Sequence, residues 1–261
     1  MRLQFPQPRA DAPLVVFDFD HTLYDGDSGS DLFGWLIRRS SWRRVLALLA
    51  APLCAPLIAF LPTRRHGISV FVWIGSVGLH RVGDFNAMID RYVATHATAI
   101  RGRLLPLALD VLQQHRSAGD QVLVATGAPP ELVRAILAFV AHEDLPVIGT
   151  LVGPRLGGIG PRRHCHAETK MTLIREAGYG EIAIAYSDSS ADLPLLLAAR
   201  KPVVVNPKAS SIAMFRRVLP SGTQFINWGC VSRAGEPPAI MVNACRDQSP
   251  SSLKKCREPS A

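Results

Sequence analysis

The stretch that decides the fold is "LVVFDFDHTLYDGDSGS", residues 14–30. Four apolar residues lead directly into two aspartates, Asp18 and Asp20, which are separated by Phe19. Such an apolar run is typical of a buried strand, whereas a carboxylate at its end needs water, a partner or a chemical role. A lone aspartate at this place would most simply cap the next helix. The wider question is which other polar residues join this pair.

Three further apolar runs, residues 121–125, 182–186 and 202–205, alternate with segments whose apolar spacing predicts helices. The predicted helices cover residues 107–119, 130–142, 170–178 and 192–200. Continuous apolar strands that alternate with amphipathic helices are typical of a parallel sheet covered on both faces. The sequence therefore predicts an α/β fold with a doubly wound, mostly parallel sheet. Ligands of such sheets lie beyond the carboxyl ends of the strands.

Polar residues gather where these strands end. Thr126 and Gly127 follow the second run, Lys170 begins a later helix, and "YSDSSADLP" supplies Asp188 and Asp192. With the aspartates of the first strand, four chain segments bring four carboxylates, a hydroxyl and an ammonium to one edge of the sheet. A helix N-cap explains one such aspartate but does not explain the whole set.

In this order, DFDHT (18–22), Thr126, Lys170 and SDSSAD (187–192) resemble the four motifs of the haloacid dehalogenase superfamily of phosphohydrolases. The resemblance implies a core of that fold with an inserted cap, and an enzyme that hydrolyses phosphoric monoesters. The carboxylate of Asp20 favours a phosphate ester over a carbon–halogen bond, because dehalogenases of the superfamily lack it.

The resemblance also implies the catalytic roles. Asp18 is expected to attack phosphorus and form an aspartyl-phosphate. Asp20 is expected to protonate the leaving oxygen and then to activate water, because a neighbouring like charge raises the pKa of a carboxyl group. Lys170 would offset charge on the nucleophile and the phosphate, and Asp192 would orient Lys170 or the metal shell.

Substrate and metal binding are assigned to the same edge. By the resemblance, Thr126, the Gly127 amide and Lys170 bind phosphoryl oxygens near a helix N-terminus. The implied cofactor is Mg²⁺, a hard ion that prefers oxygen ligands. Its implied ligands are Asp18, the main-chain carbonyl of Asp20, and Asp188.

Three residues depart from the family pattern or carry a second interpretation. His21 stands where glycine is common, and we expect a structural histidine rather than a substrate contact. Ala167 stands where relatives often have glycine. Asp27 lies nine residues after Asp18, where the phosphoserine-phosphatase-like branch has an acidic residue that faces the substrate. A turn residue in "DGDSGS" is an equal alternative for Asp27.

The segment 30–99 follows the first strand without a strand-like run and predicts an inserted helical cap. Residues 45–61 are seventeen uncharged residues flanked by arginines, and 68–79 form a second apolar run. Seventeen helical residues reach only ~26 Å, less than the ~30 Å of a bilayer core. A single crossing would also separate the first motif from the other three. We therefore expect an apolar hairpin that dips into a membrane surface, with an ordinary cap and a buried core as the alternative.

An arginine-rich turn, the long apolar stretch and "YSDSSADLPLLLAA" narrow the resemblance to the phosphatidylglycerophosphatase C family, over residues 14–207. It implies dephosphorylation of phosphatidylglycerophosphate to phosphatidylglycerol at the cytoplasmic side of the bacterial inner membrane. One alternative is a soluble, cytoplasmic phosphatase of the phosphoserine or histidinol-phosphate type. Another is a non-catalytic protein that binds anionic lipid, although intact motif residues argue against it.

The composition limits the classes of partner that we expect this protein to bind. The chain has 261 residues and a formal net charge of +8, which suits anionic ligands. Aromatic residues do not interleave the basic runs, so we expect no nucleic-acid partner. Five cysteines without a CxxC pair argue against a disulfide framework or a zinc site. The start of the chain shows no secretory signal, which favours a cytoplasmic catalytic part.

The predicted organisation has three parts. The core comprises residues 10–29 and 100–228, and residues 30–99 form the cap. Residues 229–261 are rich in serine, proline and charge, and predict a disordered tail.

Overall fold

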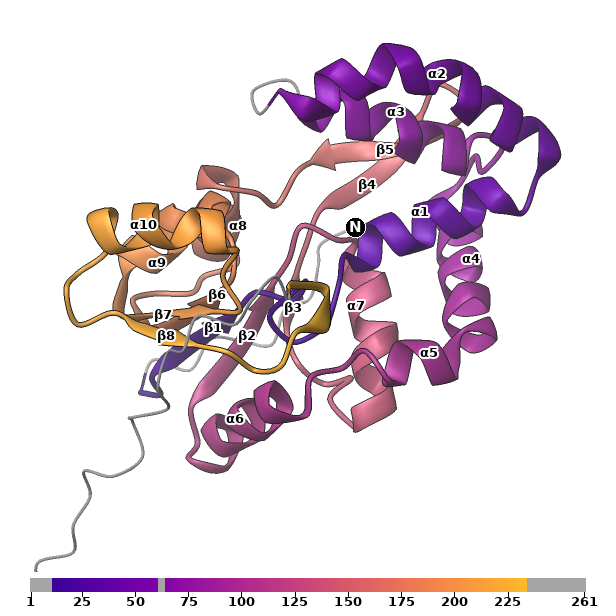
Figure 1. Cartoon of the computed structure of the whole chain (residues 1–261). Coiled ribbons are helices and arrows are strands. Elements are labelled where there is room, and N and C mark those ends of the chain that lie inside the picture. The colour runs from indigo at the N-terminus through magenta and orange to yellow at the C-terminus, as the bar shows by residue number, and fades with distance from the viewer. Residues whose placement is uncertain (1–10, 61–63, 234–261) are drawn as a thin grey trace, which may run out of the picture.

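The computed structural model describes residues 11–60 and 64–233. Six parallel strands form one sheet in the order β3-β2-β1-β6-β7-β8 (Figure 1). The strands are β1 (Leu14–Phe17), β2 (Gln121–Ala125), β3 (Val147–Ile148), β6 (Ile182–Ser187), β7 (Ala199–Val205) and β8 (Gln224–Ile226). This arrangement confirms the predicted α/β fold. The apolar pattern of the sequence does not predict β3 and β8, because both are very short.

Helices cover both faces of the sheet. One face carries α6 (Pro106–Ser117) and α7 (Pro130–Leu137). The other carries α8 (Glu168–Glu176), α9 (Leu193–Ala198) and α10 (Ala209–Val218). In β1, Val15 and Phe17 join the first core, and Leu14 and Val16 join the second. Because successive side chains of a strand point to opposite faces, a strand buried on both sides is apolar throughout.

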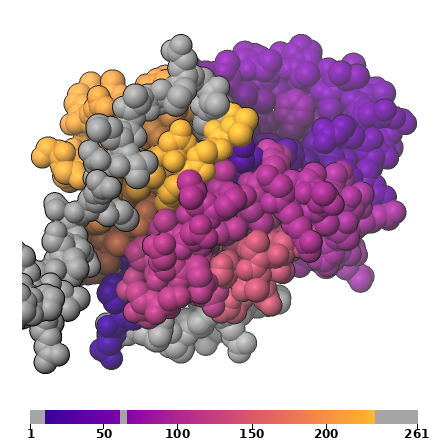
Figure 2. Space-filling model, turned by 60° about the horizontal axis from the view of Figure 1, so that its bottom comes forward, coloured from indigo at the N-terminus to yellow at the C-terminus, as the bar shows by residue number. Residues whose placement is uncertain are grey.

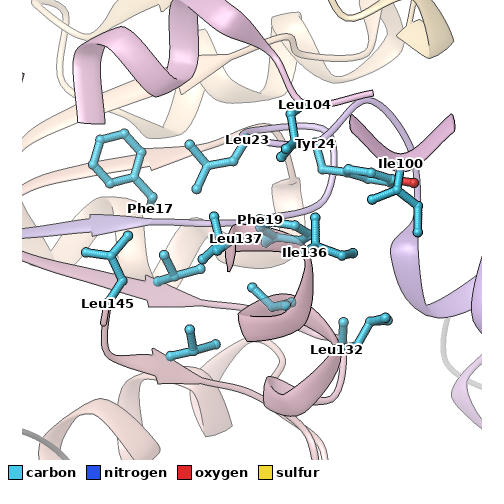
Figure 3. Close-up of a cluster of buried hydrophobic side chains, with 14 of the residues drawn as sticks. Phe17, Phe19, Leu23, Tyr24, Ile100, Leu104, Leu132, Ile136, Leu137 and Leu145 are labelled. Atoms are coloured by element: carbon cyan, nitrogen blue, oxygen red, sulfur yellow. The ribbon is translucent and has the colours of Figure 1, made fainter. Parts of the chain in front are cut away.

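The first core continues from the sheet toward the insertion. Figure 3 shows Phe19, Ile136 and Leu137 in its middle, with Tyr24 and Ile100 at one end. Tyr24 follows the first motif, and Ile100 lies near the end of the insertion. The core therefore packs the loop after β1 and the insertion together.

Helices make up the insertion, as predicted. In chain order they are α1 (Ser28–Arg38), α2 (Ser41–Ala59), α3 (Arg64–Ser76), α4 (Val82–Thr95) and α5 (Ala97–Arg101). Figure 1 shows α2 and α3 beside each other, at the end of the molecule away from the sheet. Among the described helices, α2 alone is long and apolar enough to cross a membrane by length and composition, and 6% of it is buried. The structure leaves most of α2 exposed, with Cys54 as its buried residue, and the choice between a membrane-dipping hairpin and an ordinary cap stays a prediction.

A β-hairpin that the sequence pattern does not predict connects the insertion to the core. Its strands are β4 (Leu151–Arg155) and β5 (Gly158–Arg163), and their glycines and prolines hide the strand pattern. The Ser76 hydroxyl at the end of α3 donates to the Ile159 carbonyl at 2.7 Å and accepts from the Ile159 amide at 3.0 Å. A Cβ on Gly158 would lie 3.0 Å from the Cα of Val77, so only glycine fits this approach without a shift.

The chain enters and leaves the insertion through two neighbouring segments. The Asp25 amide donates to the Arg103 carbonyl at 2.6 Å, and the Leu105 amide donates to the Leu23 carbonyl at 3.0 Å. The Arg103 side chain adds a bond to the Asp25 carbonyl at 2.6 Å. Together with the hairpin, these bonds attach the insertion to the core at two separate places.

The C-terminal prediction needs one correction. We expected a disordered tail from residue 229, but residues 229–233 are described and include the short helix Val231–Arg233. Main-chain amides of Val231 and Ser232 donate to the Asp25 carboxylate, each at 2.9 Å. Composition cannot reveal this contact, because the partners are more than 200 residues apart. Residues 234–261 lie outside the described residues.

Candidate active site

Strand register brings the first, second and fourth motifs together. In the sheet, Phe17 of β1 pairs with Val124 of β2 on one side and Tyr186 of β6 on the other. The next residues along the three parallel strands, which include Asp18 and Thr126, therefore emerge at the same edge. The Asp18 amide continues the pairing and donates to the Tyr186 carbonyl at 2.9 Å. The predicted convergence at the carboxyl ends of the strands is thus present.

Lys170 connects two of the predicted carboxylates. Its Nζ atom lies 3.0 Å from Asp18 Oδ1 and 2.6 Å from Asp192 Oδ2. The Ser187 hydroxyl donates to the same oxygen of Asp192 at 2.8 Å. Lys170 and Asp192 are each only 2% exposed, so water has little access to these ion pairs. Lys170 lies in the first turn of α8, which packs on the sheet through Met171 and other apolar residues.

Burial sets the protonation of this group. Desolvation raises the pKa of Asp18 to about 6, although the Lys170 ammonium acts in the opposite direction. Burial alone would lower the pKa of Lys170, but the carboxylates of Asp18 and Asp192 outweigh it and raise that pKa. The lysine therefore stays protonated, while Asp18 is close to its titration range near neutral pH.

Asp20 is held by the start of α1. Its Oδ1 atom accepts a hydrogen bond from the Ser28 amide at 2.7 Å. Desolvation raises the pKa of Asp20 well above its ordinary value, and the nearby charge of Asp27 adds to this effect. Asp27 itself is the N-cap of α1 and accepts from the Ser30 amide at 2.7 Å. The turn interpretation of Asp27 is thus present in the structure, and its contact with substrate stays a prediction.

Thr126 and Gly127 form a short loop between β2 and α7. The Thr126 hydroxyl accepts from the Ala128 amide at 3.0 Å, and the Thr150 hydroxyl donates to the Gly127 carbonyl at 2.6 Å. Both bonds fix the loop just before Pro130, where α7 begins. Main-chain amides ahead of a helix N-terminus suit an anion such as phosphate.

Residues 15–197 match the family described as haloacid dehalogenase-like hydrolase. This chain belongs to that family. The matched range includes the predicted motif residues from Asp18 to Asp192 and most of the sheet.

Relatives place the hydrolase near the phosphoserine-phosphatase-like branch. Phosphoserine phosphatase SerB1 of Mycobacterium tuberculosis is 27% identical over 257 residues, which cover 91% of this chain and 79% of that protein. A protein of unknown function from Bordetella pertussis is similar in structure, with a TM-score of 0.62, 24% identity, and coverage of 83% of this chain and 99% of that chain. A phosphoserine phosphohydrolase-like protein from Francisella tularensis has a TM-score of 0.53, with 12% identity and coverage of 82% and 94%. These two structural likenesses support the fold.

The side chains of this hydrolase fit a divalent cation. In the described part of the chain, three carboxylates at this edge are buried against one buried ammonium, that of Lys170. The buried carboxylates are Asp18, Asp188 and Asp192. Burying an excess of negative charge is costly without a counter-ion. Carboxylate and carbonyl oxygens are the donors that Mg²⁺ prefers, so the predicted ligands fit the predicted metal.

The two departures from the family pattern have a backbone explanation. His21 has a φ of 57° and Ala167 a φ of 49°, a region that L-residues rarely adopt and glycine adopts freely. The Nδ1 atom of His21 lies 3.1 Å from the Ser232 hydroxyl, which agrees with the structural interpretation of this histidine. Ala167 immediately precedes α8, so its strained backbone helps to set the position of Lys170 in the first turn of that helix.

Two positioning residues were missed from the sequence. Ser187 orients Asp192 through its hydroxyl, and Ser28 orients Asp20 through its main-chain amide. Ser187 is the first residue of the quoted motif "SDSSAD", so the motif could have predicted its role in the site. The role of Ser28 depends on the path of the loop before α1, and no local pattern marks it.

Proposed function

We propose that this hydrolase is a Mg²⁺-dependent phosphomonoesterase that works through an aspartyl-phosphate on Asp18. The observation that carries the proposal is the buried Lys170 bridge between Asp18 and Asp192, at the carboxyl ends of the strands. A lysine so placed holds the nucleophile and offsets charge beside it. Few purely structural needs would favour burying such a cluster.

The chemistry follows from the two aspartates of the first motif. Asp18 attacks phosphorus through a carboxylate oxygen, and the bond from phosphorus to the leaving oxygen breaks. Asp20, whose raised pKa favours the acid form, gives its proton to the leaving oxygen. As a carboxylate, Asp20 then takes a proton from water, which attacks the aspartyl-phosphate and releases phosphate.

The remaining groups hold the phosphate. Thr126, the Gly127 amide and Lys170 bind its oxygens and steady the charge that develops there. Asp18, the carbonyl of Asp20 and Asp188 would hold Mg²⁺, which supplies additional charge stabilisation when bound. Each role is the one that the family resemblance implies for that residue, and these residues lie together at the edge of the sheet.

A small soluble phosphomonoester of the phosphoserine kind is the first candidate substrate. Support comes from the similarity to phosphoserine phosphatase SerB1 along 91% of the chain. The charge of Asp27 raises the pKa of Asp20, so the Asp27 carboxylate lies near the proposed site. This exposed negative charge would suit the amine of a substrate such as phosphoserine. One oxygen of Asp27 caps α1, so the second would make this contact.

A phospholipid monoester such as phosphatidylglycerophosphate is the second candidate, and α2 is the observation that favours it. Leu48, Leu49 and Leu53 of this helix are 73%, 67% and 74% exposed. Exposed arginines at positions 38, 39 and 44 lie before and at the start of the same helix. An apolar face next to positive charge suits an anionic membrane surface, where a lipid phosphate would be presented.

Replacement of the nucleophile tests the mechanism. Asp18→Asn should lower Mg²⁺-dependent release of phosphate by at least about 10³-fold, because the amide cannot form the aspartyl-phosphate. The matched control is Asp110→Asn on the exposed side of α6, which should keep full activity. Near-wild-type turnover of Asp18→Asn would remove the covalent mechanism.

A substrate screen separates the two candidates. Purified protein is assayed for phosphate release from phosphoserine, histidinol phosphate and phosphatidylglycerophosphate in vesicles. A preference for a soluble ester supports the first candidate, and a preference for the lipid supports the second. Activity on none of these, with turnover of a generic aryl phosphate, would reject both substrates and leave the mechanism in place.

A further inference from the structure

Three side chains of types that can hold a metal ion lie together, and none of them is assigned to the proposed phosphate site. His21, Asp25 and Cys230 each offer one ligand atom, and the three atoms lie within 4.8 Å of one another. Cys230 Sγ is 3.1 Å from Asp25 Oδ1 and 3.9 Å from His21 Nδ1. In a tetrahedral zinc site, bond lengths of 2.0–2.3 Å place neighbouring ligand atoms ~3.5 Å apart. The observed separations lie on either side of that value.

We propose that His21, Asp25 and Cys230 bind one Zn²⁺ ion. Imidazole nitrogen, carboxylate oxygen and thiolate sulfur together suit Zn²⁺ rather than Mg²⁺, which prefers oxygen alone. Ser232 stands beside the cluster, with its hydroxyl 3.1 Å from His21 Nδ1 and 3.3 Å from Cys230 Sγ. The fourth position of the ion therefore belongs to this hydroxyl or to a water molecule.

The existing hydrogen bonds hold the ligands in place for the ion. Two oxygens of Asp25 accept the amides of Val231 and Ser232, and Oδ1 also accepts from the Cys230 thiol. Each carboxylate oxygen has two acceptor sites, so the amide bonds need not break. Zn²⁺ takes the place of the thiol proton, which leaves to solvent, and a Zn–S bond replaces the weak S–H···O bond.

Chain spacing could not reveal this site. Cys230 and Asp25 are 205 residues apart, and the absence of a CxxC pair had argued against zinc. The ligands meet because Asn206 joins both segments: its amide donates to the His21 carbonyl at 2.8 Å and its oxygen accepts from the Trp228 amide at 2.7 Å. Figure 2 shows the yellow end of the described chain at the surface, beside a small indigo patch from the N-terminal part. Bound Zn²⁺ would tie this end to the loop that carries Asp20.

Cobalt titration of the full-length protein tests the proposal without using activity. Chelator-treated protein in excess Mg²⁺ is titrated with Co²⁺, a spectroscopic substitute for zinc. We expect a thiolate-to-Co²⁺ charge-transfer band that saturates at one ion per chain and disappears when Zn²⁺ is added. Oxygen ligands of the catalytic edge cannot produce this band. Absence of the band in the wild-type protein would overturn the proposal.

Matched variants identify the ligands. Cys230→Ser should lose the band, whereas Cys54→Ser and a Cys245→Ser, Cys256→Ser double variant should keep it. Asp25→Asn keeps one oxygen that accepts an amide, although its NH2 group cannot accept the other, and His21→Asn tolerates a positive φ, so both should fold. Each should weaken Co²⁺ binding about tenfold or more. A band that survives in Cys230→Ser, or unchanged affinity in both asparagine variants, would overturn the site.

Discussion

At the scale of single residues, the proposed role of Asp18 as a Mg²⁺ ligand predicts that metal binding depends on pH. Its burial raises its pKa to about 6, so a proton occupies the carboxyl group at a pH where an exposed aspartate is already ionised. Protons and Mg²⁺ compete for the same oxygens. Apparent affinity for Mg²⁺ should therefore be full above pH ~7 and fall about tenfold by pH ~5, because only about a tenth of Asp18 is then ionised.

Calorimetric titration with Mg²⁺ at both pH values measures this shift. The test uses metal-free protein, since the pKa of Asp18 refers to that state. Equal affinity at the two pH values would show that Asp18 is not the titrating ligand, or that it is ionised throughout.

Ala167 offers a second prediction at this scale. Its φ of 49° and ψ of −130° lie in a region that essentially only glycine populates without strain. Ala167→Gly should raise the free energy of unfolding by about 1 kcal/mol, since relief of strain exceeds the entropy that glycine adds to the unfolded chain. Denaturant unfolding measures the change.

Ala118→Gly is the matched control, because Ala118 has an ordinary φ of −74° and ψ of −7°. This variant relieves no strain and should be neutral or less stable. Destabilisation of Ala167→Gly to the same extent would mean that the backbone at Ala167 is not strained.

At the scale of elements, one serine joins the hairpin to the insertion. The buried Ser76 hydroxyl bonds both main-chain groups of Ile159, and Ile159 is fully buried. Ser76→Ala would leave a buried amide and carbonyl without this partner, so it should lower the free energy of unfolding by about 1–3 kcal/mol. The exposed Ser117 at the end of α6 supplies the control, since Ser117→Ala should change stability little. Equal stability of the two variants would show that the α3–β5 contact contributes nothing.

At the scale of the whole molecule, the proposed membrane role depends on the exposed apolar face of α2. Replacing Leu48, Leu49 and Leu53 with serine removes exposed apolar area without opening the core, so folding should be unaffected. If this face enters an anionic bilayer, partition into such vesicles should fall more than about tenfold. Sedimentation with vesicles, together with the ratio of rates on lipid and soluble phosphate esters, measures the effect.

Leu107→Ser with Leu197→Ser is the control, because both leucines are exposed on core helices, at 55% and 53%. That pair should leave partition unchanged. Equal partition of the wild type and the α2 variant would remove the membrane role, and the soluble ester would then be the remaining candidate.

The sequence by itself determined four strands of the sheet and the edge where the motif residues gather. Four apolar runs placed β1, β2, β6 and β7, because a strand buried on both faces needs apolar residues throughout. Motif order then placed Asp18, Thr126, Lys170 and Asp188 at the ends of strands or the start of a helix. These are local features, and each is readable from a short window of residues.

Only the tertiary structure decided which side chains meet. Lys170 and Asp18 are 152 residues apart, and Cys230 and Asp25 are 205 apart, so no local pattern pairs them. The glycine-rich β4–β5 hairpin has little strand propensity, and pairing of its two strands with each other, together with contact to Ser76, stabilises it instead. The exposure of α2 likewise depends on what packs against it: an apolar helix has the same sequence whether its face is covered by protein or left open. The physical reason is common to all three, since burial and pairing are properties of neighbours in space rather than of neighbours in the chain.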